Sequence, residues 1–231
     1  MNGHPLTFAG AQLCALASGA LWWADERLLC VSDLHLGKAE RFARRGGTLL
    51  PPYETDATLD RLEALVDGLS PACVVCLGDS FDDRAAAEAL CEGHRLRIAR
   101  LQAGRDWIWI EGNHDPGPTE LAGRHLESLS VGAVTFRHIT GETPDISGHY
   151  HPKARMPGGT RAAFLADANR IILPAFGAYT GGLSCTDPPL RTLFGADAVA
   201  VLTGPRAVPV PLSKLGQSRG SRSPALTRFG R

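Results

Sequence analysis

Short runs of apolar residues, separated by turn residues, dominate the beginning of the chain. They occupy residues 6–8, 12–16, 20–23 and 28–31, and further runs follow at 73–77 and 107–110. Runs of this length bounded by turn residues predict strands. The runs at 28–31, 73–77 and 107–110 are apolar at every position, which is typical of strands buried on both faces.

Helical periodicity occupies the intervals between these runs. The spacing of apolar residues predicts helices at 37–45, 56–69 and 84–102. Later in the chain the pattern becomes nearly all strand, at 131–139, 145–147, 161–165, 170–173, 198–202 and 207–210. Alternating strands and helices followed by strands predict an α/β (α+β) protein, with mixed sheets and covering helices packed as layers. We expect a single domain over residues 1–213.

The composition agrees with a folded body and adds a charge asymmetry. Of the 231 residues, 44% are hydrophobic and 21% are charged. The formal net charge is zero, but residues 214–231 contain basic residues and no acid, so the rest of the chain has an excess of carboxylates. Such a body favours cation binding. We interpret 214–231 as a basic, disordered C-terminal tail that either meets an anionic partner or only aids solubility.

Cysteine usage and the N-terminal segment bear on the cellular compartment. Cys73 and Cys76 form a C-x-x-C pair inside an apolar run, so we interpret them as small buried hydrophobes rather than as a zinc or redox site. Free thiols fit a reducing compartment. The apolar stretch at 13–23 is too short to span a bilayer and lacks the basic flank of a signal peptide. We therefore expect a cytoplasmic protein without a membrane segment.

Polar residues with metal-binding chemistry follow the ends of the predicted strands. In chain order they are Asp33, His35, Asp79, Asn113, His114, His138, His149 and His151. Sites in α/β folds lie in the crevice outside the carboxyl ends of the strands. Side chains two residues apart on an extended segment point to the same side, so Asp33 and His35 can converge. Each piece alone has a plainer explanation, such as a turn at Asp79 or a packed core histidine at His138. Together they predict a metal site.

The donor types narrow the choice of metal. Oxygen and nitrogen ligands without a thiolate suit manganese, iron, zinc or nickel better than calcium or magnesium. Seven ligands that share one carboxylate would give two ions four protein contacts each. Because Asn113 and His114 are adjacent, they cannot easily face the same ion, and one of them is free to contact substrate. We assign no role to His4, His94 or His125.

The order of these motifs resembles the calcineurin-like metallophosphoesterase superfamily. The matching pieces, across residues 28–155, are Asp-x-His, Gly-Asp, Gly-Asn-His-Asp, a lone His and Gly-His-x-His. Two softer motifs, His-Leu-Gly-Lys at 35–38 and Leu-Pro-Ala-Phe-Gly-Ala-Tyr-Thr-Gly-Gly at 173–182, are similar to one branch, the bacterial ligase-associated DNA-damage-response endonucleases (PdeM). The resemblance implies the metallophosphoesterase fold, a four-layer αββα sandwich of two mixed β-sheets flanked by helices.

The resemblance also implies a dinuclear centre with two divalent ions, manganese being the first choice. One ion would be held by Asp33, His35, Asp79 and His151, and the other by Asp79, Asn113, His138 and His149, with Asp79 as the bridge. His114 would be the catalytic residue, contacting the scissile phosphate and helping the leaving oxygen depart. Asp82 and Asp115 would hold a ligand ring or a water in place.

The implied activity is hydrolysis of phosphodiester bonds by a water activated between the two ions. In the branch named above the substrate would be DNA, cleaved during repair beside a DNA ligase and a helicase. The short interval between His138 and His149 leaves no room for a lid. The basic residues Lys38, Arg41, Arg44 and Arg45, with Lys153 and Arg155, either flank the metals and bind phosphates or form a solvated face.

Two other readings remain open. One is a small-molecule phosphoesterase that acts on a nucleotide or a lipid-precursor pyrophosphate. The other is a non-enzymatic scaffold, which predicts missing ligands, whereas none is missing here. The block at 78–83 lacks the Asp-Arg-Gly continuation of the Ser/Thr phosphatases, which argues against that substrate class.

Overall fold

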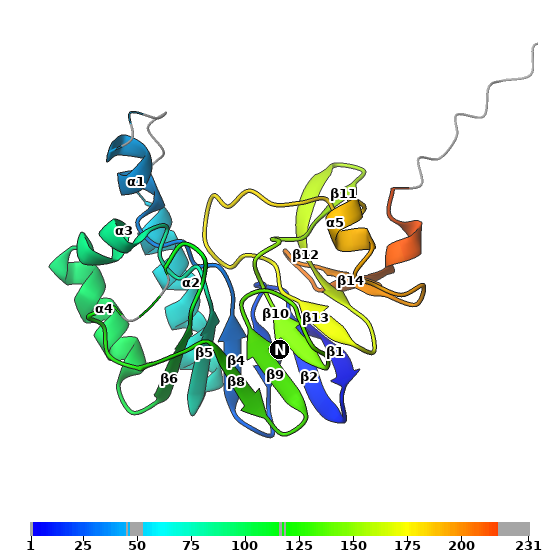
Figure 1. The fold of residues 1–231 in the computed structure, drawn as a ribbon, viewed down its shortest axis with the longest axis horizontal. Helices are drawn as coiled ribbons and strands as arrows, with labels where there is room; N and C mark the ends of the chain where they lie inside the picture. The colour runs from blue at the N-terminus through cyan, green and yellow to red at the C-terminus, as the bar shows by residue number, and fades with distance from the viewer. Residues whose placement is uncertain (1, 45, 47–52, 116, 118, 217–231) are drawn as a thin grey trace, which may run out of the picture.

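The computed structural model describes residues 2–44, 46, 53–115, 117 and 119–216 and contains two β-sheets packed face to face (Figure 1). In the described residues the first sheet has the order β1-β2-β3-β4-β5-β6-β7. Pairing is antiparallel from β1 to β4 and parallel from β4 to β7. The bounds are Gly3–Phe8, Ala11–Leu16, Leu21–Trp23, Leu28–Val31, Cys73–Leu77, Asp106–Ile110 and Arg124–Leu126.

The second sheet comes from the later part of the chain. Its order is β15-β14-β12-β13-β10-β9-β8, with β11 paired to β12 outside this path. Both β9 and β13 run parallel to β10, whereas the other pairs are antiparallel, so this sheet is mixed as well. The bounds from β8 to β15 are Ser128–Val131, Val134–Arg137, Asp145–Ser147, Lys153–Met156, Gly159–Ala166, Arg170–Ile172, Val199–Leu202 and Val208–Pro211.

Helices cover the outer faces of both sheets (Figure 1). Beside the first sheet lie α1 (Lys38–Arg44), α2 (Glu54–Leu69), α3 (Arg84–Glu88) and α4 (Glu92–Gln102). The second sheet has a thinner cover, formed by α5 (Pro188–Arg191), the short 3-10 helix η1 (Leu212–Lys214) and the segments around them. The layers are therefore helix, sheet, sheet and helix, as the sequence predicts. No helix within the described ranges is long and apolar enough to cross a bilayer.

Alternation along the strands explains these layers. Val75 and Leu77 of β5 point into the core between the two sheets, whereas Val74 and Cys76 point toward the helices. Side chains on a strand alternate between its faces, so a strand covered on both sides must be apolar throughout. Both cysteines of this strand have free thiols; Cys76 is buried, as expected, whereas Cys73 is half-buried, and burial raises the pKa of the Cys73 thiol to about 11.

Two predicted elements are wrong in detail. The helix predicted at 84–102 is two helices, because Arg95 turns back to donate to the carbonyl oxygens of Ala87, Glu88 and Leu90 and so caps the end of α3. The strand predicted at 131–139 is a hairpin, in which β8 and β9 are joined by a turn with Gly132 at φ +57°.

Other short elements were not predicted. They are β7, β8, β11, α5 and η1. Leu215 is buried against the second sheet, so the folded body reaches at least two residues beyond the predicted boundary at 213. The remainder of the predicted tail, 217–231, lies outside the described residues, as does Arg45.

Candidate metal centre

The predicted ligands come together where strands of both sheets end. In the first sheet, Asp33 and His35 follow β4, Asp79 follows β5, and Asn113 follows β6. In the second sheet, His138 follows β9, and the pair His149 and His151 follows β10. Strands β4, β5 and β6 run parallel, and so do β9 and β10, so each set presents its carboxyl ends at one edge. Packing the sheets face to face joins the two edges into one site.

The first group of donors consists of Asp33, His35 and His151. Asp33 Oδ1 lies 3.2 Å from His151 Nε2, and His35 Nε2 lies 3.4 Å from the same nitrogen. Asp33 is completely buried, and its other oxygen accepts hydrogen bonds from the Ser32 hydroxyl and, at 3.0 Å, from the backbone N–H of His149. These hydrogen bonds hold the carboxylate with one oxygen turned toward the imidazoles.

The second group consists of Asp79, His138 and His149, with Asn113 beside them. His138 Nε2 lies 3.4 Å from Asp79 Oδ2, 3.2 Å from His149 Nδ1 and 2.9 Å from Asn113 Oδ1. His138 Nδ1 lies 3.9 Å from Asp33 Oδ1, which links this group to the first. Asp79 belongs to the second group of donors and not to the first. Its Oδ1 accepts a hydrogen bond from the backbone N–H of His114 at 2.8 Å.

The electrostatics of the second group favour an ionised carboxylate. Burial alone would raise the pKa of Asp79, but hydrogen bonds from His138 and from the backbone of His114 lower it to about 2. Burial alone would lower the pKa of His138, yet its hydrogen bond to Asp79 and the charge of Asp33 raise it to about 9. Buried carboxylates of this kind need a positive partner, which here is either a proton on the imidazole or a cation.

The backbone of the ligand loops departs from the geometry expected from the sequence. Asp33 and His35 have φ of +51° and +47°, so they lie in the left-handed region and not on an extended segment. Asp79, His149 and His151 share this region, with φ of +45°, +69° and +47°. Backbone strain of this kind gathers at functional sites. The convergence of Asp33 and His35 is correct, but it results from tight turns after the strand.

Gly148 shows how closely the two sheets approach at the site. A Cβ at this position would overlap the Ser32 hydroxyl and lie 2.5 Å from Asp33 Oδ2. The glycine of the Gly-His-x-His motif is therefore required by contact with the first-sheet ligand loop, which brings His149 and His151 into reach of Asp33.

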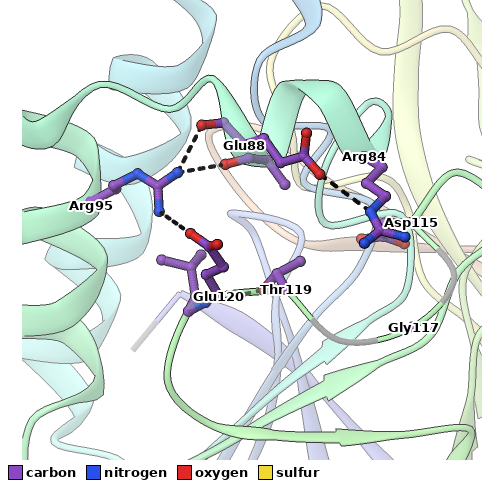
Figure 2. Close-up of a pocket in the computed structure, with 9 residues that line it drawn as sticks. Arg84, Glu88, Arg95, Asp115, Gly117, Thr119 and Glu120 are labelled. Atoms are coloured by element: carbon purple, nitrogen blue, oxygen red, sulfur yellow. Dashed lines mark hydrogen bonds and ion pairs between the residues drawn. The ribbon is translucent and has the colours of Figure 1, made fainter.

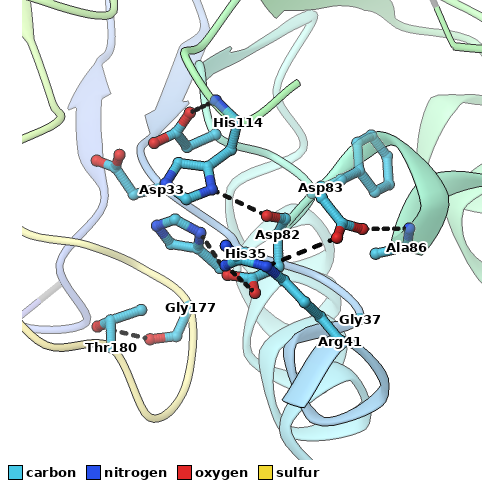
Figure 3. Close-up of polar contacts among 12 residues, drawn as sticks. Asp33, His35, Gly37, Arg41, Asp82, Asp83, Ala86, His114, Gly177 and Thr180 are labelled. Atoms are coloured by element: carbon cyan, nitrogen blue, oxygen red, sulfur yellow. Dashed lines mark hydrogen bonds and ion pairs between the residues drawn. The ribbon is translucent and has the colours of Figure 1, made fainter. Parts of the chain in front are cut away.

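His114 lies beside the metal-binding groups in an orientation that its neighbours fix (Figure 3). Its Nδ1 lies 2.9 Å from the carbonyl oxygen of Asp82, and because a carbonyl only accepts, Nδ1 carries the hydrogen. Its ring is perpendicular to that of His35 at a centroid distance of 5.3 Å. Nε2 is left to exchange a proton with a reacting group.

Asp82 supports the first group from behind. Its Oδ1 lies 3.1 Å from His35 Nδ1, and its Oδ2 accepts a hydrogen bond from Arg41 Nη1 at 2.9 Å (Figure 3). Burial alone would raise the pKa of Asp82, but these contacts with His35 and Arg41 lower it to about 2. Asp82 therefore holds the ring of His35, a predicted ligand, as the resemblance implies. One donor atom from each of His35, Asp82 and His114 lies within 4.8 Å of the other two, so these residues form a third cluster.

Asp115 fixes a loop of the site. Its Oδ2 accepts hydrogen bonds from the backbone N–H groups of Ser80 and Phe81, at 2.7 and 3.1 Å, and so holds the loop after Asp79. No hydrogen bond to a predicted ligand ring is found for it among the described residues, and a water held by its other oxygen, which is buried without a partner, stays a prediction. Burial raises the pKa of Asp115 to about 7. Figure 2 shows it at one end of a cavity of about 120 Å³, where basic and acidic side chains from α3, α4 and the loop at Glu120 pair with one another.

Two basic residues on α1, Arg41 and Arg44, for which we expect either phosphate binding or a solvated face, pair with acidic residues of the chain. Arg41 pairs with Asp82 and Asp83, and Arg44 pairs with Asp83 at 2.8 Å. Their charges are thus neutralised within the protein. The sequence could not show this because Asp82 and Asp83 lie about forty residues away along the chain.

The segment at 173–182 is a part of the site that residue chemistry alone missed. The backbone N–H groups of Phe176 and Gly177 donate to the carbonyl oxygens of Ser32 and Asp33, at 2.7 and 3.1 Å. Gly182 packs on the backbone of His151. This segment therefore bridges the two sheets beside the first group of donors, and its motif in the sequence was the one available signal.

Comparison with known proteins agrees with this geometry. The family model described as calcineurin-like phosphoesterase matches residues 26–183, which include all the donors described above. The chain belongs to the calcineurin-like phosphoesterase family. A crystal structure of the nuclease MPE of Pseudomonas putida is similar to this one, with a TM-score of 0.72 and 27% sequence identity over 90% of this chain and 100% of that chain. Among curated proteins no match was found.

As a calcineurin-like phosphoesterase, this protein is a hydrolase that acts on phosphoester bonds with the help of divalent metal. The residues present fit such an ion. In each group, imidazole nitrogens and carboxylate oxygens converge. Two imidazole nitrogens face each other at 3.4 Å in the first group and at 3.2 Å in the second, and a cation between the two nitrogens would bind both. The donors include no thiolate, in line with the sequence-based choice of metals.

Proposed function

We propose that this phosphoester hydrolase is a nuclease that cleaves phosphodiester bonds in DNA and uses two divalent ions, one for each group of donors. The observation that carries the proposal is the pair of donor groups linked by the 3.9 Å contact between Asp33 and His138. The similarity to a nuclease over 90% of this chain supports a nucleic acid as substrate. Only ten residues separate His138 from His149, too few for an inserted lid at that point, and a site without a lid there suits a polymer.

Each residue has a defined task in this proposal. Asp33, His35 and His151 would hold one ion, and Asp79, Asn113, His138 and His149 the other, with Asp79 as the predicted bridge. The ions would supply a water of lowered pKa and positive charge beside the phosphate. His114, fixed through the Asp82 carbonyl, would give a proton from Nε2 to the leaving oxygen. Asp82 keeps the His35 ring in position.

The cellular role follows from the branch resemblance. We propose manganese as the metal, with iron, zinc and nickel as alternatives, and a function in DNA repair beside a DNA ligase and a helicase in the cytoplasm. Motifs at 35–38 and 173–182 support this branch. A companion ligase or helicase gene in the same neighbourhood would strengthen it.

The test is hydrolysis by manganese-loaded protein of an activated phosphodiester, of single-stranded, nicked and flapped DNA, and of a panel of nucleotides. We expect His114→Ala and Asp79→Asn to lose at least roughly 100-fold in kcat/KM, because each removes a group at the reacting centre. His4→Ala, on β1 and in none of the donor groups found among the described residues, is the matched control and should keep wild-type activity.

Wild-type rates in His114→Ala and Asp79→Asn would refute the assignment of the site. Hydrolysis of nucleotides without cleavage of any DNA would refute the nuclease and favour the small-molecule alternative.

A further inference from the structure

A cavity of about 350 Å³ lies next to the first group of donors, and none of the roles above uses it. Its volume is at the small end of the range for ligand pockets. It is lined by Ser18 and Gly19, by Arg61 of α2, by Lys153 of β11, by Thr160 and Thr203, and by part of the segment 174–180. Gly177, in its wall, donates to the Asp33 carbonyl, and Lys153 stands two residues after His151. Figure 3 shows the loop carrying Gly177 and Thr180 beside Asp33 and His35.

The charge of this cavity is positive. Arg61 and Lys153 line it, and no acidic side chain is among the described residues that do. Lys153 Nζ donates to the carbonyl oxygen of Thr180 at 2.6 Å, which leaves further N–H donors on the ammonium. Arg61 Nη2 donates to the Ser18 carbonyl at 2.8 Å, and its guanidinium carbon lies 4.3 Å from the centre of the Phe176 ring. Both cations are thus held in place by the protein without being neutralised.

Tyr179 adds an aromatic surface at the same cavity. Tyr179 is 56% exposed, and no ring, hydrogen-bond or ion partner is found for it among the residues that the structure describes. Its φ of +55° is unfavourable for a tyrosine, so the surrounding loop imposes this orientation. An unpartnered aromatic ring beside paired cations is the combination by which proteins hold unpaired nucleotides.

We propose that Arg61, Lys153 and Tyr179 form a subsite for the nucleotide next to the scissile phosphate. Lys153 and Arg61 bind a non-bridging phosphate oxygen, and the base stacks on Tyr179. This inference rests on the proposed nuclease function and adds to it the surface that distinguishes a polymer from a small phosphodiester.

The test compares cleavage of a single-stranded oligonucleotide with hydrolysis of bis-p-nitrophenyl phosphate, a diester that has no second phosphate and no nucleobase. In Tyr179→Ala, KM for the oligonucleotide should rise roughly 5- to 100-fold, the range for loss of one stacked base. Tyr179→Phe should restore it. In Lys153→Met, the slope of log kcat/KM against log salt should become shallower by about 0.7, the value for one phosphate contact on a single strand.

Matched controls separate the subsite from a general loss of charge or of aromatic surface. Arg100→Met removes an exposed positive charge from α4, and Tyr53→Ala removes a tyrosine that is 68% exposed, yet neither residue lines this cavity. Both should behave as wild type. The ratio of oligonucleotide to small-diester kcat/KM should fall only in the Lys153 and Tyr179 variants.

Two results would overturn the subsite: an unchanged ratio, including an equal loss on both substrates, or an equal change in the controls. A wild-type protein that hydrolyses the small diester but no oligonucleotide would instead refute the nuclease function itself, so the two failures are distinguishable.

Discussion

Asp82→Asn tests whether the metal centre depends on the hydrogen bonds behind it. The Asp82 side chain is 2% exposed, and it accepts from His35 Nδ1 at 3.1 Å and from Arg41 Nη1 at 2.9 Å. Asparagine has one oxygen and one donating NH₂ group in place of two acceptors, so one of these donors loses its partner. A hydrogen bond to a charged group contributes about 1.5–3 kcal/mol. Loss of such a partner behind a metal ligand lowers metal affinity or activity by roughly 10- to 100-fold.

We expect Asp82→Asn to need roughly 10- to 100-fold more manganese for half-maximal activity. The measurement is a titration of phosphodiesterase rate against metal concentration, together with the free energy of unfolding in urea. Asp83→Asn is the matched control, since Asp83 also pairs with Arg41 but is 24% exposed and does not touch His35. Asparagine can still cap α3 at this position, so its cost should stay below about 1 kcal/mol. Equal metal requirements in the two variants would refute the reasoning.

Three further changes test the packing around the site. Gly148→Ala places a Cβ against Ser32 and Asp33 and should reduce activity by roughly 100-fold, whereas Gly181→Ala, where a Cβ meets nothing within 4 Å, should be neutral in the same rate assay. Removing metal with EDTA should abolish activity and lower Tm by about 5–10 °C. This shift corresponds to the stabilisation of about 2.7 kcal/mol that metal binding gives at a concentration a hundredfold above Kd. An unchanged Tm would contradict metal binding. Phe136→Ala empties a fully buried position between the sheets and should lower the free energy of unfolding by about 3–5 kcal/mol in urea.

The sequence predicts the central elements of the fold because their apolar periodicity is strong. The strands at 73–77 and 145–147 have the bounds that periodicity indicates, since each is buried and ends at polar residues. Short or exposed elements lack that signal. Arg124–Leu126 has no alternation to detect, and the break between α3 and α4 depends on contacts made by Arg95, which periodicity cannot show.

For the site, as for the fold, the sequence predicts features that depend on neighbouring residues and does not predict those that depend on residues far apart in the chain. The sequence could place Asp33, His35 and Asp79 at strand ends because their positions depend on local pattern. It could not place Arg41 on Asp82, or Lys153 on Thr180, since these partners are set by how separate segments pack. The sequence also did not predict the left-handed turns at the ligands, because aspartate and histidine carry no obligatory signal for positive φ.

Each group of donors takes side chains from both sheets, so the metal centre connects the two sheets. The first group takes Asp33 and His35 from the first sheet and His151 from the second, and these residues are separated by up to 118 positions in the chain. The second group likewise joins Asp79 to His138 and His149. Each ion would therefore bind both sheets at once. The core between the sheets brings the donors close, and metal binding would in turn hold the sheets together at this edge. For this reason we expect removal of metal to weaken the contact between the sheets at the catalytic edge first, while the far end of the core stays packed, and hydrogen exchange at β10 compared with β2 measures it.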